Sequence, residues 1–318
     1  MTTASSQRRP LALVTGATGQ DGIYLSLHLA ATGTEVLASR RTATARDLYL
    51  AHPRITVVDL DVTDTAAFAA LLRARQIDEV YQLAAVSSVA RSWDDPRATV
   101  AVNADAVEGM LAAVRHIRPQ ARFFQASSVQ AGTTSPYAAS KLAAEGWVAD
   151  ARARGLFAVS GRLANHESPL RPAHFVSRRI ARAAACGDVL DIGDLSSERD
   201  WGHARDHVAA MPQLLRLAEP LDADICTGVR QPLRALAEAA YRAAGREPGA
   251  YVVETATVAR PADPAAVGGS AEAITRATGW QARTSVADLM AEMVAVEARR
   301  LATGAEDDPG YLGMRVSE

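Results

Sequence analysis

The alternation of short apolar runs with longer alanine- and leucine-rich segments is the feature that most constrains the fold of this chain. Runs that are apolar throughout, rather than alternating, are typical of strands buried on both faces of a sheet. The predicted strands are Leu11–Thr15, Glu35–Ser39, Ile55–Asp59, Glu79–Leu83, Arg122–Ser127 and Phe157–Leu163. The segments with helical spacing between them are Gly22–Ala31, Thr65–Arg75, Ala98–His116 and Tyr137–Arg154. The pattern predicts an α/β protein with a Rossmann-like, doubly wound parallel sheet.

The pattern changes after about Asn165, where prolines and glycines separate shorter elements. We predict further helices at Phe175–Ala185, Asp206–Leu217, Leu233–Ala244, Ser270–Thr278 and Val286–Leu301. The chain is therefore divided into a first domain over residues 1–164, to which it returns around 203–228, and a smaller mixed C-terminal domain over 165–318. Ligands of open α/β sheets bind at the carboxyl ends of the strands, so we expect the substrate between the two domains.

Composition excludes several classes of protein. The 318 residues carry a formal net charge of −2, which gives no electrostatic reason to bind nucleic acid or an anionic membrane. No apolar run is long enough to span a bilayer, and residues 1–10 lack the apolar stretch of a signal peptide. Cys186 and Cys226 match neither a metal-ligand spacing nor a disulfide framework. We expect a cytoplasmic protein without a metal site.

A glycine-rich turn follows the first predicted strand and opens a helix. Its sequence is Gly16-Ala17-Thr18-Gly19-Gln20-Asp21-Gly22. Glycines at these three positions permit a tight turn, a close approach of the backbone to a pyrophosphate, and close packing of helix on strand. The N-terminus of the helix then offers N–H groups and a positive dipole end to the phosphates. The turn predicts a dinucleotide site.

The end of the second strand indicates which dinucleotide binds. An NAD site usually has an acidic residue there to accept a hydrogen bond from the ribose 2′-hydroxyl. This chain has Ser39-Arg40-Arg41-Thr42 instead. Two guanidinium groups suit a 2′-phosphate, so the prediction is NADP.

A serine, a tyrosine and a lysine form a candidate catalytic group. Ser128 follows the strand Arg122–Ser127, and Tyr137 and Lys141 share one face at the start of the next helix. The ammonium lowers the pKa of the phenol, which can then take a proton from a substrate hydroxyl as hydride leaves the same carbon. Ser128 would hydrogen-bond that oxygen. We interpret the three residues as an oxidation site.

Longer motifs make a family resemblance specific. The chain resembles the extended short-chain dehydrogenase/reductases, also called the NAD-dependent epimerase/dehydratase superfamily, and within them the GDP-mannose 4,6-dehydratase family. The resemblance runs from about residue 11 to about residue 297. It rests on the glycine-rich turn, Tyr81-Gln82-Leu83-Ala84-Ala85, Gln125-Ala126-Ser127-Ser128, Asn165-His166-Glu167-Ser168-Pro169, Arg199-Asp200-Trp201-Gly202-His203-Ala204-Arg205-Asp206, Arg260-Pro261 and Thr278-Gly279-Trp280.

The resemblance implies roles for matching positions. The NADP site would include Gly16, Thr18, Gly19, Gln20, Asp21, Gly22, Arg40, Arg41, Asp61, Val62, Leu83, Ala84, Ala85, Ser87, Lys141, His166 and Arg171. The nucleotide sugar, expected to be a GDP-hexose, would meet Ser87, Ser128, Tyr137, Asn165, Arg178, Arg199 and Arg260. Guanidiniums suit a diphosphate. The resemblance also implies a homodimer or homotetramer.

One departure from the family leaves the reaction open. The dehydratases have a glutamate two positions after the catalytic Ser/Thr, and it removes the C5 proton after C4 is oxidised; this chain has Gln130. A carboxamide cannot transfer that proton near neutral pH. A 4,6-dehydratase would need a substitute base, Glu167 or Tyr137 itself. A 4-epimerase or a 4-keto-sugar reductase needs only Ser128, Tyr137 and Lys141, and a binding protein without turnover is the third alternative.

Overall fold

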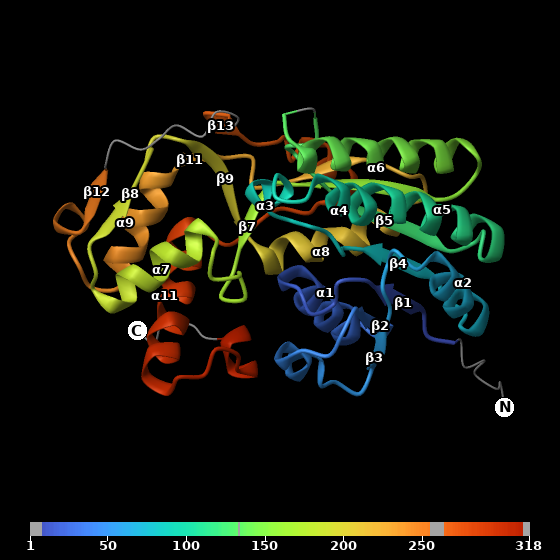
Figure 1. Cartoon of the computed structure of the whole chain (residues 1–318), viewed down its shortest axis with the longest axis horizontal. Coiled ribbons are helices and arrows are strands. Elements are labelled where there is room, and N and C mark those ends of the chain that lie inside the picture. Colours follow the sequence, from blue (N-terminus) through green and yellow to red (C-terminus); the bar gives the residue numbers. More distant parts are fainter. Residues whose placement is uncertain (1–7, 133, 255–263, 314–318) are drawn as a thin grey trace.

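A seven-stranded parallel sheet organises the computed structural model, which describes residues 8–132, 134–254 and 264–313 (Figure 1). Its strand order is β10-β6-β5-β4-β1-β2-β3. The bounds are β1 Leu11–Val14, β2 Glu35–Arg40, β3 Ile55–Asp59, β4 Glu79–Gln82, β5 Arg122–Ser128, β6 Ala158–Leu163 and β10 Ala223–Ile225. The predicted strands thus form within one residue of their expected bounds, and the doubly wound fold is confirmed.

Helices cover both faces of this sheet. One face carries α1 (Gln20–Ala31) and α8 (Ala204–Leu215), whose apolar residues pack on strand residues such as Val14 and Phe124. The other carries α2 (Thr65–Ala74), α5 (Ala106–Ile117) and α6 (Pro136–Ala153), packed on residues such as Leu13 and Phe123. Neighbouring residues of one strand therefore enter different cores, which explains why the strands are apolar throughout.

The segment before α5 differs from the prediction. In place of one helix over Ala98–His116, the chain forms α4 (Pro96–Val100), a π-helical turn η2 (Ala101–Asp105) and then α5. Single π turns insert an extra residue and reorient the side chains around them. Here the turn carries Asn103, whose side chain accepts from Val86 N and donates to Val86 O and Ser140 Oγ at 2.8, 3.1 and 3.1 Å. The buried amide gains three partners from this arrangement.

A second lobe lies beyond the carboxyl ends of the strands (Figure 1). Its helices α7 (Val176–Cys186), α9 (Leu233–Ala243) and α11 (Val286–Thr303) share a core of their own. Its strands are β7 (Asn165–Glu167), β8 (Leu190–Ile192), β9 (Glu198–His203), β11 (Arg230–Pro232), β12 (Val252–Glu254) and β13 (Ala266–Val267), with β7, β11 and β13 all pairing with β9. The small helices are η1 (Ala45–Leu50), α3 (Val89–Ser92), η3 (Pro248–Ala250), α10 (Glu272–Thr278) and η4 (Pro309–Leu312). None of the described helices combines the length and apolar character needed to cross a membrane.

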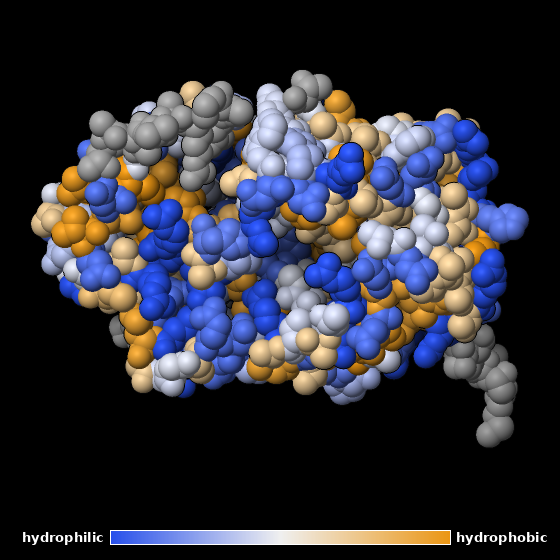
Figure 2. All heavy atoms as spheres, viewed as in Figure 1, coloured by the Kyte–Doolittle hydropathy of each residue, from blue (hydrophilic) through white to orange (hydrophobic). Residues whose placement is uncertain are grey.

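The chain passes between the two lobes more than once. After β7 and β9, helix α8 returns to pack against α1, and β10 adds to the edge of the main sheet beside β6. The space-filling view shows hydrophilic side chains gathered where the two lobes meet (Figure 2). The residues predicted to bind ligands come mostly from this junction.

Candidate active site

The glycine-rich turn has the geometry that its sequence predicts. Gly16 has φ +64°, a left-handed conformation that favours glycine, and accepts a hydrogen bond from Gly19 N at 2.9 Å. A Cβ on Gly22 would lie 2.3 Å from Gly16 O and 2.5 Å from Ala17 Cα, so this helix residue must be glycine. Gly19 is the N-cap of α1, and among the described residues no side chain caps the helix. The first N–H groups of α1 are therefore open to an anion.

The turn is fixed to the end of β4. Thr15 Oγ1 accepts hydrogen bonds from Leu83 N at 3.0 Å and Ala84 N at 3.2 Å. The predicted residues Leu83, Ala84 and Ala85 are half-buried beside the turn, and Ser87 is exposed. The structure thus brings the segment after β4 to the glycine-rich turn.

The basic turn after β2 is only partly as expected. Arg40 donates from Nε to Asp59 at 2.9 Å and forms a second ion pair with Asp47, whereas Arg41 is exposed. Asp61 is exposed and accepts from Thr63 N at 2.9 Å, and Val62 is buried. A 2′-phosphate at this turn would compete with two carboxylates for Arg40.

Ser128, Tyr137 and Lys141 come together at the carboxyl end of β5. Ser135 caps α6 by accepting from Ala138 N, and Pro136 follows at the first helical position, so α6 begins immediately before Tyr137. Ser128 is close enough to Tyr137 to act against the rise of its phenol pKa. Lys141 Nζ lies 5.8 Å from the centroid of the Tyr137 ring and donates to Ala126 O at 2.7 Å.

The electrostatics of this group differ from the expectation. Burial raises the pKa of Tyr137, although the Ser128 hydrogen bond and the charge of Arg171 act in the opposite direction. Burial lowers the pKa of Lys141 to about 8, against the attraction of Asp21 and Glu145. Ser128 and Arg171 therefore favour the phenolate, against burial and the charge of Asp21.

Asp21 and His166 form a buried pair beneath the glycine-rich turn. His166 Nε2 lies 2.9 Å from Asp21 Oδ2, and its Nδ1 lies 2.7 Å from Ala164 O. Burial opposes the charge of Asp21, but His166 outweighs it through its own charge and hydrogen bond and holds the pKa of Asp21 at about 2. The ring of His207 stacks on His166 with centroids 5.0 Å apart. Sequence reasoning assigned no role to His207, and nothing local to it signals this contact.

The predicted substrate residues are not all at one place. Asn165 lies on β7 opposite Trp201. Arg171, predicted for the NADP site, is half-buried nearby in the chain, pairs with Glu167 at 2.9 Å and stacks on Phe175. Arg178 is buried between Glu297 and Glu306, each at 2.7 Å. Arg199 is buried on β9 and donates to Glu198 O at 2.8 Å. Arg260 lies outside the described residues.

The structure also places Gln130, which stands at the position of the missing base, and Glu167, one of the candidate substitutes for it. Gln130 is half-buried and donates its backbone N–H to Ser128 Oγ at 3.1 Å. Glu167 is buried, accepts from Ser177 Oγ at 2.6 Å and pairs with Arg171. The Glu167 carboxylate is therefore already held by two partners.

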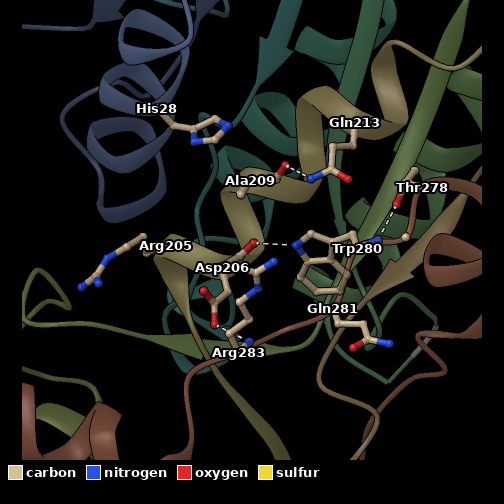
Figure 3. A pocket seen from close by; sticks show the side chains of 10 residues that line it. His28, Arg205, Asp206, Ala209, Gln213, Thr278, Trp280, Gln281 and Arg283 are labelled. Atoms are coloured by element: carbon tan, nitrogen blue, oxygen red, sulfur yellow. Dashed lines mark hydrogen bonds between the residues drawn. The ribbon is translucent and has the colours of Figure 1, made fainter.

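A hollow of about 470 Å³ lies elsewhere, against α1, α8 and the turn after α10 (Figure 3). His28, Gln213 and Trp280 are among its lining residues, and Trp280 donates from Nε1 to Asp206 O at 3.0 Å. The predicted catalytic residues Ser128, Tyr137 and Lys141 do not line it. The candidate active site is the junction of the lobes, not this hollow.

Solved structures share the fold of this chain. A dTDP-glucose 4,6-dehydratase of Streptomyces venezuelae with NAD bound has a TM-score of 0.82 and 22% identity, covering 92% of this chain and 98% of that chain. A Pseudomonas aeruginosa protein complexed with NADPH has a TM-score of 0.76 and 23% identity, covering 92% and 99%. The sheet order, the glycine-rich turn and the Tyr–Lys pair define a short-chain dehydrogenase/reductase fold of the epimerase/dehydratase type.

The family within this class follows from sequence comparison. A family model described as GDP-mannose 4,6 dehydratase matches residues 13–293. A GDP-mannose 4,6-dehydratase of Yersinia enterocolitica is 32% identical, covering 89% of this chain and 92% of that protein. Another from Sordaria araneosa is 32% identical over 96% of this chain, which spans 64% of that longer protein. The chain belongs to the GDP-mannose 4,6-dehydratase family.

Proposed function

We propose that this protein is an NADP-dependent enzyme that oxidises a GDP-linked hexose at C4, with 4,6-dehydration as the net reaction. The observation that carries the proposal is the position of Tyr137 at the start of α6, beside Ser128 at the carboxyl end of β5 and with Lys141 Nζ 5.8 Å from its ring centroid. This is where an open parallel sheet binds its ligands. Membership of the family supports the sugar nucleotide and the dehydration.

The cofactor is proposed from the groups around the glycine-rich turn. The uncapped N-terminus of α1 fits a pyrophosphate, and Gly19, which is exposed, leaves room for it. The exposed Arg41, together with its neighbour Arg40 at the end of β2, would hold the 2′-phosphate that distinguishes NADP from NAD. When bound, the nicotinamide supplies the acceptor and later the donor of hydride.

The protein groups provide the acid–base chemistry of the oxidation. Tyr137 takes the proton from the C4 hydroxyl, and Ser128 hydrogen-bonds the same oxygen and so keeps it near the phenol. Lys141 adds a positive charge on the same helix face, one turn on. These three groups suffice for removal and return of a proton at C4.

The elimination across C5 and C6 is the less supported part of the proposal. Gln130 replaces the glutamate of the family and cannot act as a base. Glu167, which is paired with Arg171 and Ser177, is poorly placed to take its role. This observation favours a second candidate function, a nucleotide-sugar 4-epimerase or 4-keto-sugar reductase, in which Ser128, Tyr137 and Lys141 act without a further carboxylate.

One incubation separates these reactions. The enzyme, NADP⁺ and GDP-mannose are combined in heavy water, and the product is read by mass spectrometry and NMR. A dehydratase gives a product that has lost water and carries deuterium at C5. An epimerase gives an isomer without a C5 label. Formation of neither product, with NADP bound, contradicts dehydration and epimerisation and leaves only the reductase, which NADPH and a 4-keto sugar nucleotide then test.

A further inference from the structure

Three arginines, two of them from distant parts of the chain, hold one short loop, residues 168–171. Successive carbonyl oxygens of the loop each accept a hydrogen bond from a different guanidinium. The pairs are Pro169 O with Arg300 Nη2 at 2.8 Å, Leu170 O with Arg46 Nη2 at 2.7 Å, and Arg171 O with Arg178 Nη1 at 3.1 Å. A loop held at three consecutive carbonyls has little freedom to move.

The same loop rests on the glycine-rich turn. Ser168 Oγ donates to Gln20 Oε1 at 2.8 Å, and Gln20 Nε2 donates to His166 O at 3.1 Å. Arg46 adds a direct bridge, because its Nη1 donates to Thr18 O at 3.2 Å while its Nη2 holds Leu170 O. Of the three arginines, Arg46 is therefore the one that joins the loop to the turn.

Arg46 is held in turn by the C-terminal segment. Its Nε lies 3.4 Å from Asp307 Oδ1, and Asp307 also accepts from Tyr49 OH at 3.3 Å. The Tyr49 hydroxyl accepts from Asp308 N at 3.0 Å, so η1 is bound to this segment at two points. Arg46 and Asp307 are largely buried, with side chains 22% and 15% exposed.

We propose that Arg46 is a positioning residue of the dinucleotide site, which keeps the loop 168–171 against the glycine-rich turn and is itself oriented by Asp307. The inference rests on the proposed function, because that function places a dinucleotide at this turn. Arg46 reaches two backbone carbonyls with separate nitrogens, which lysine, with a single nitrogen, cannot reproduce. Its effect on the bound cofactor is indirect, through the position of the turn and of Arg171.

The test measures dinucleotide binding rather than turnover. NADPH and NADH are titrated against wild type, Arg46→Gln and Arg46→Lys by nucleotide fluorescence, and hydrogen exchange of the peptide containing residues 168–171 is followed. The matched control is Arg118→Gln, because Arg118 also bridges two carbonyls, Leu72 O and Arg75 O, but does so between α2 and α5. Asp307→Asn is a second variant that keeps Arg46 and removes only its charged partner.

We expect Arg46→Gln to raise the dissociation constant of the preferred dinucleotide about tenfold and to speed exchange in the loop. Arg46→Lys should recover part of the affinity, Asp307→Asn should show a smaller loss, and Arg118→Gln should bind like wild type. Equal affinities in Arg46→Gln and Arg118→Gln would overturn the inference and leave the proposed function intact. A wild-type protein that binds neither dinucleotide would overturn the proposed function as well.

Discussion

Tyr137 and Gln130 are the two residues on which the proposed reaction depends most. Tyr137 is placed by the start of α6, and its pKa is raised by burial. Gln130 donates its backbone N–H to Ser128 Oγ, and its carboxamide stands where the family resemblance implies a glutamate. In the proposed reaction, Tyr137 would decide whether C4 is oxidised, and residue 130 would decide whether water is then lost across C5 and C6.

Replacing Tyr137 by Phe should abolish turnover and leave binding of the nucleotide sugar almost unchanged. The ring and its packing remain, but the group that takes the proton is lost, which costs about 10²- to 10⁴-fold in kcat. Steady-state kinetics with isothermal titration calorimetry separates the two effects. Activity equal to wild type would contradict the assignment of Tyr137 as the acid–base group.

Replacing Gln130 by Glu should increase the fraction of product that has lost water. The substitution conserves the shape of the side chain and restores a carboxylate that can accept the C5 proton. Gln130→Asn is the matched control, since it stays an amide. If both variants give the wild-type product ratio, the missing carboxylate does not limit elimination.

At the scale of elements, β7 and α8 meet through two stacked histidines at the candidate site. His166 on β7 stacks against His207 on α8, and Gly202 on β9 leaves the space that the His207 ring occupies, because a Cβ there would lie 2.2 Å from His207 Cε1. Burial lowers the pKa of His207 to about 3, with the charge of His166 acting in the same direction. The folded protein therefore keeps His207 neutral.

The neutral, buried His207 makes the free energy of unfolding depend on pH. Below about pH 6.5 the unfolded chain binds a proton at His207 that the folded chain does not, so stability falls as the pH falls from 6.5 toward 3. Well below pH 6.5, this one proton changes the free energy of unfolding by about 1.4 kcal/mol per pH unit. His207→Phe should remove this contribution to the pH dependence of the free energy of unfolding, as measured by urea unfolding between pH 7 and pH 5. A variant with the same slope as wild type would contradict a neutral, buried His207.

Elements with a strong local pattern were predictable, and elements defined by their partners were not. The six predicted strands follow from apolar runs, and α6 follows from helical spacing. The π turn at Ala101–Asp105 was missed because its cause is Asn103 reaching Val86 and Ser140, a tertiary contact. The three-residue strands β7 and β8 exist only because they pair with β9 and β12.

At the scale of the whole molecule, an apolar surface supports the prediction of a homo-oligomer. Large exposed hydrophobic side chains occur on α3, α4 and α6, which contact one another. They are Val89, Trp93, Val100, Leu142 and Trp147. Exposed apolar side chains on neighbouring elements are a feature of many protein interfaces.

The expected outcome is a dimer in solution that Leu142→Asp, combined with Trp147→Asp, converts to a monomer. Charges placed on this face of α6 would be desolvated in an interface between two copies. Light scattering during size-exclusion chromatography measures the mass, and Val229→Asp, at an exposed valine on the loop before β11, is the control. A wild-type monomer would contradict the prediction.

The sequence by itself determined the parallel sheet, the glycine-rich turn and the positions of Ser128, Tyr137 and Lys141, because each follows from local periodicity or from the ends of neighbouring strands. Only the tertiary structure decided the partners of the charged residues. Asp21 pairs with His166, Arg46 with Leu170 O and Asp307, and Arg178 with Glu297 and Glu306 rather than with an open crevice. These partners lie far apart along the chain, and buried charges are compensated only once packing brings them together.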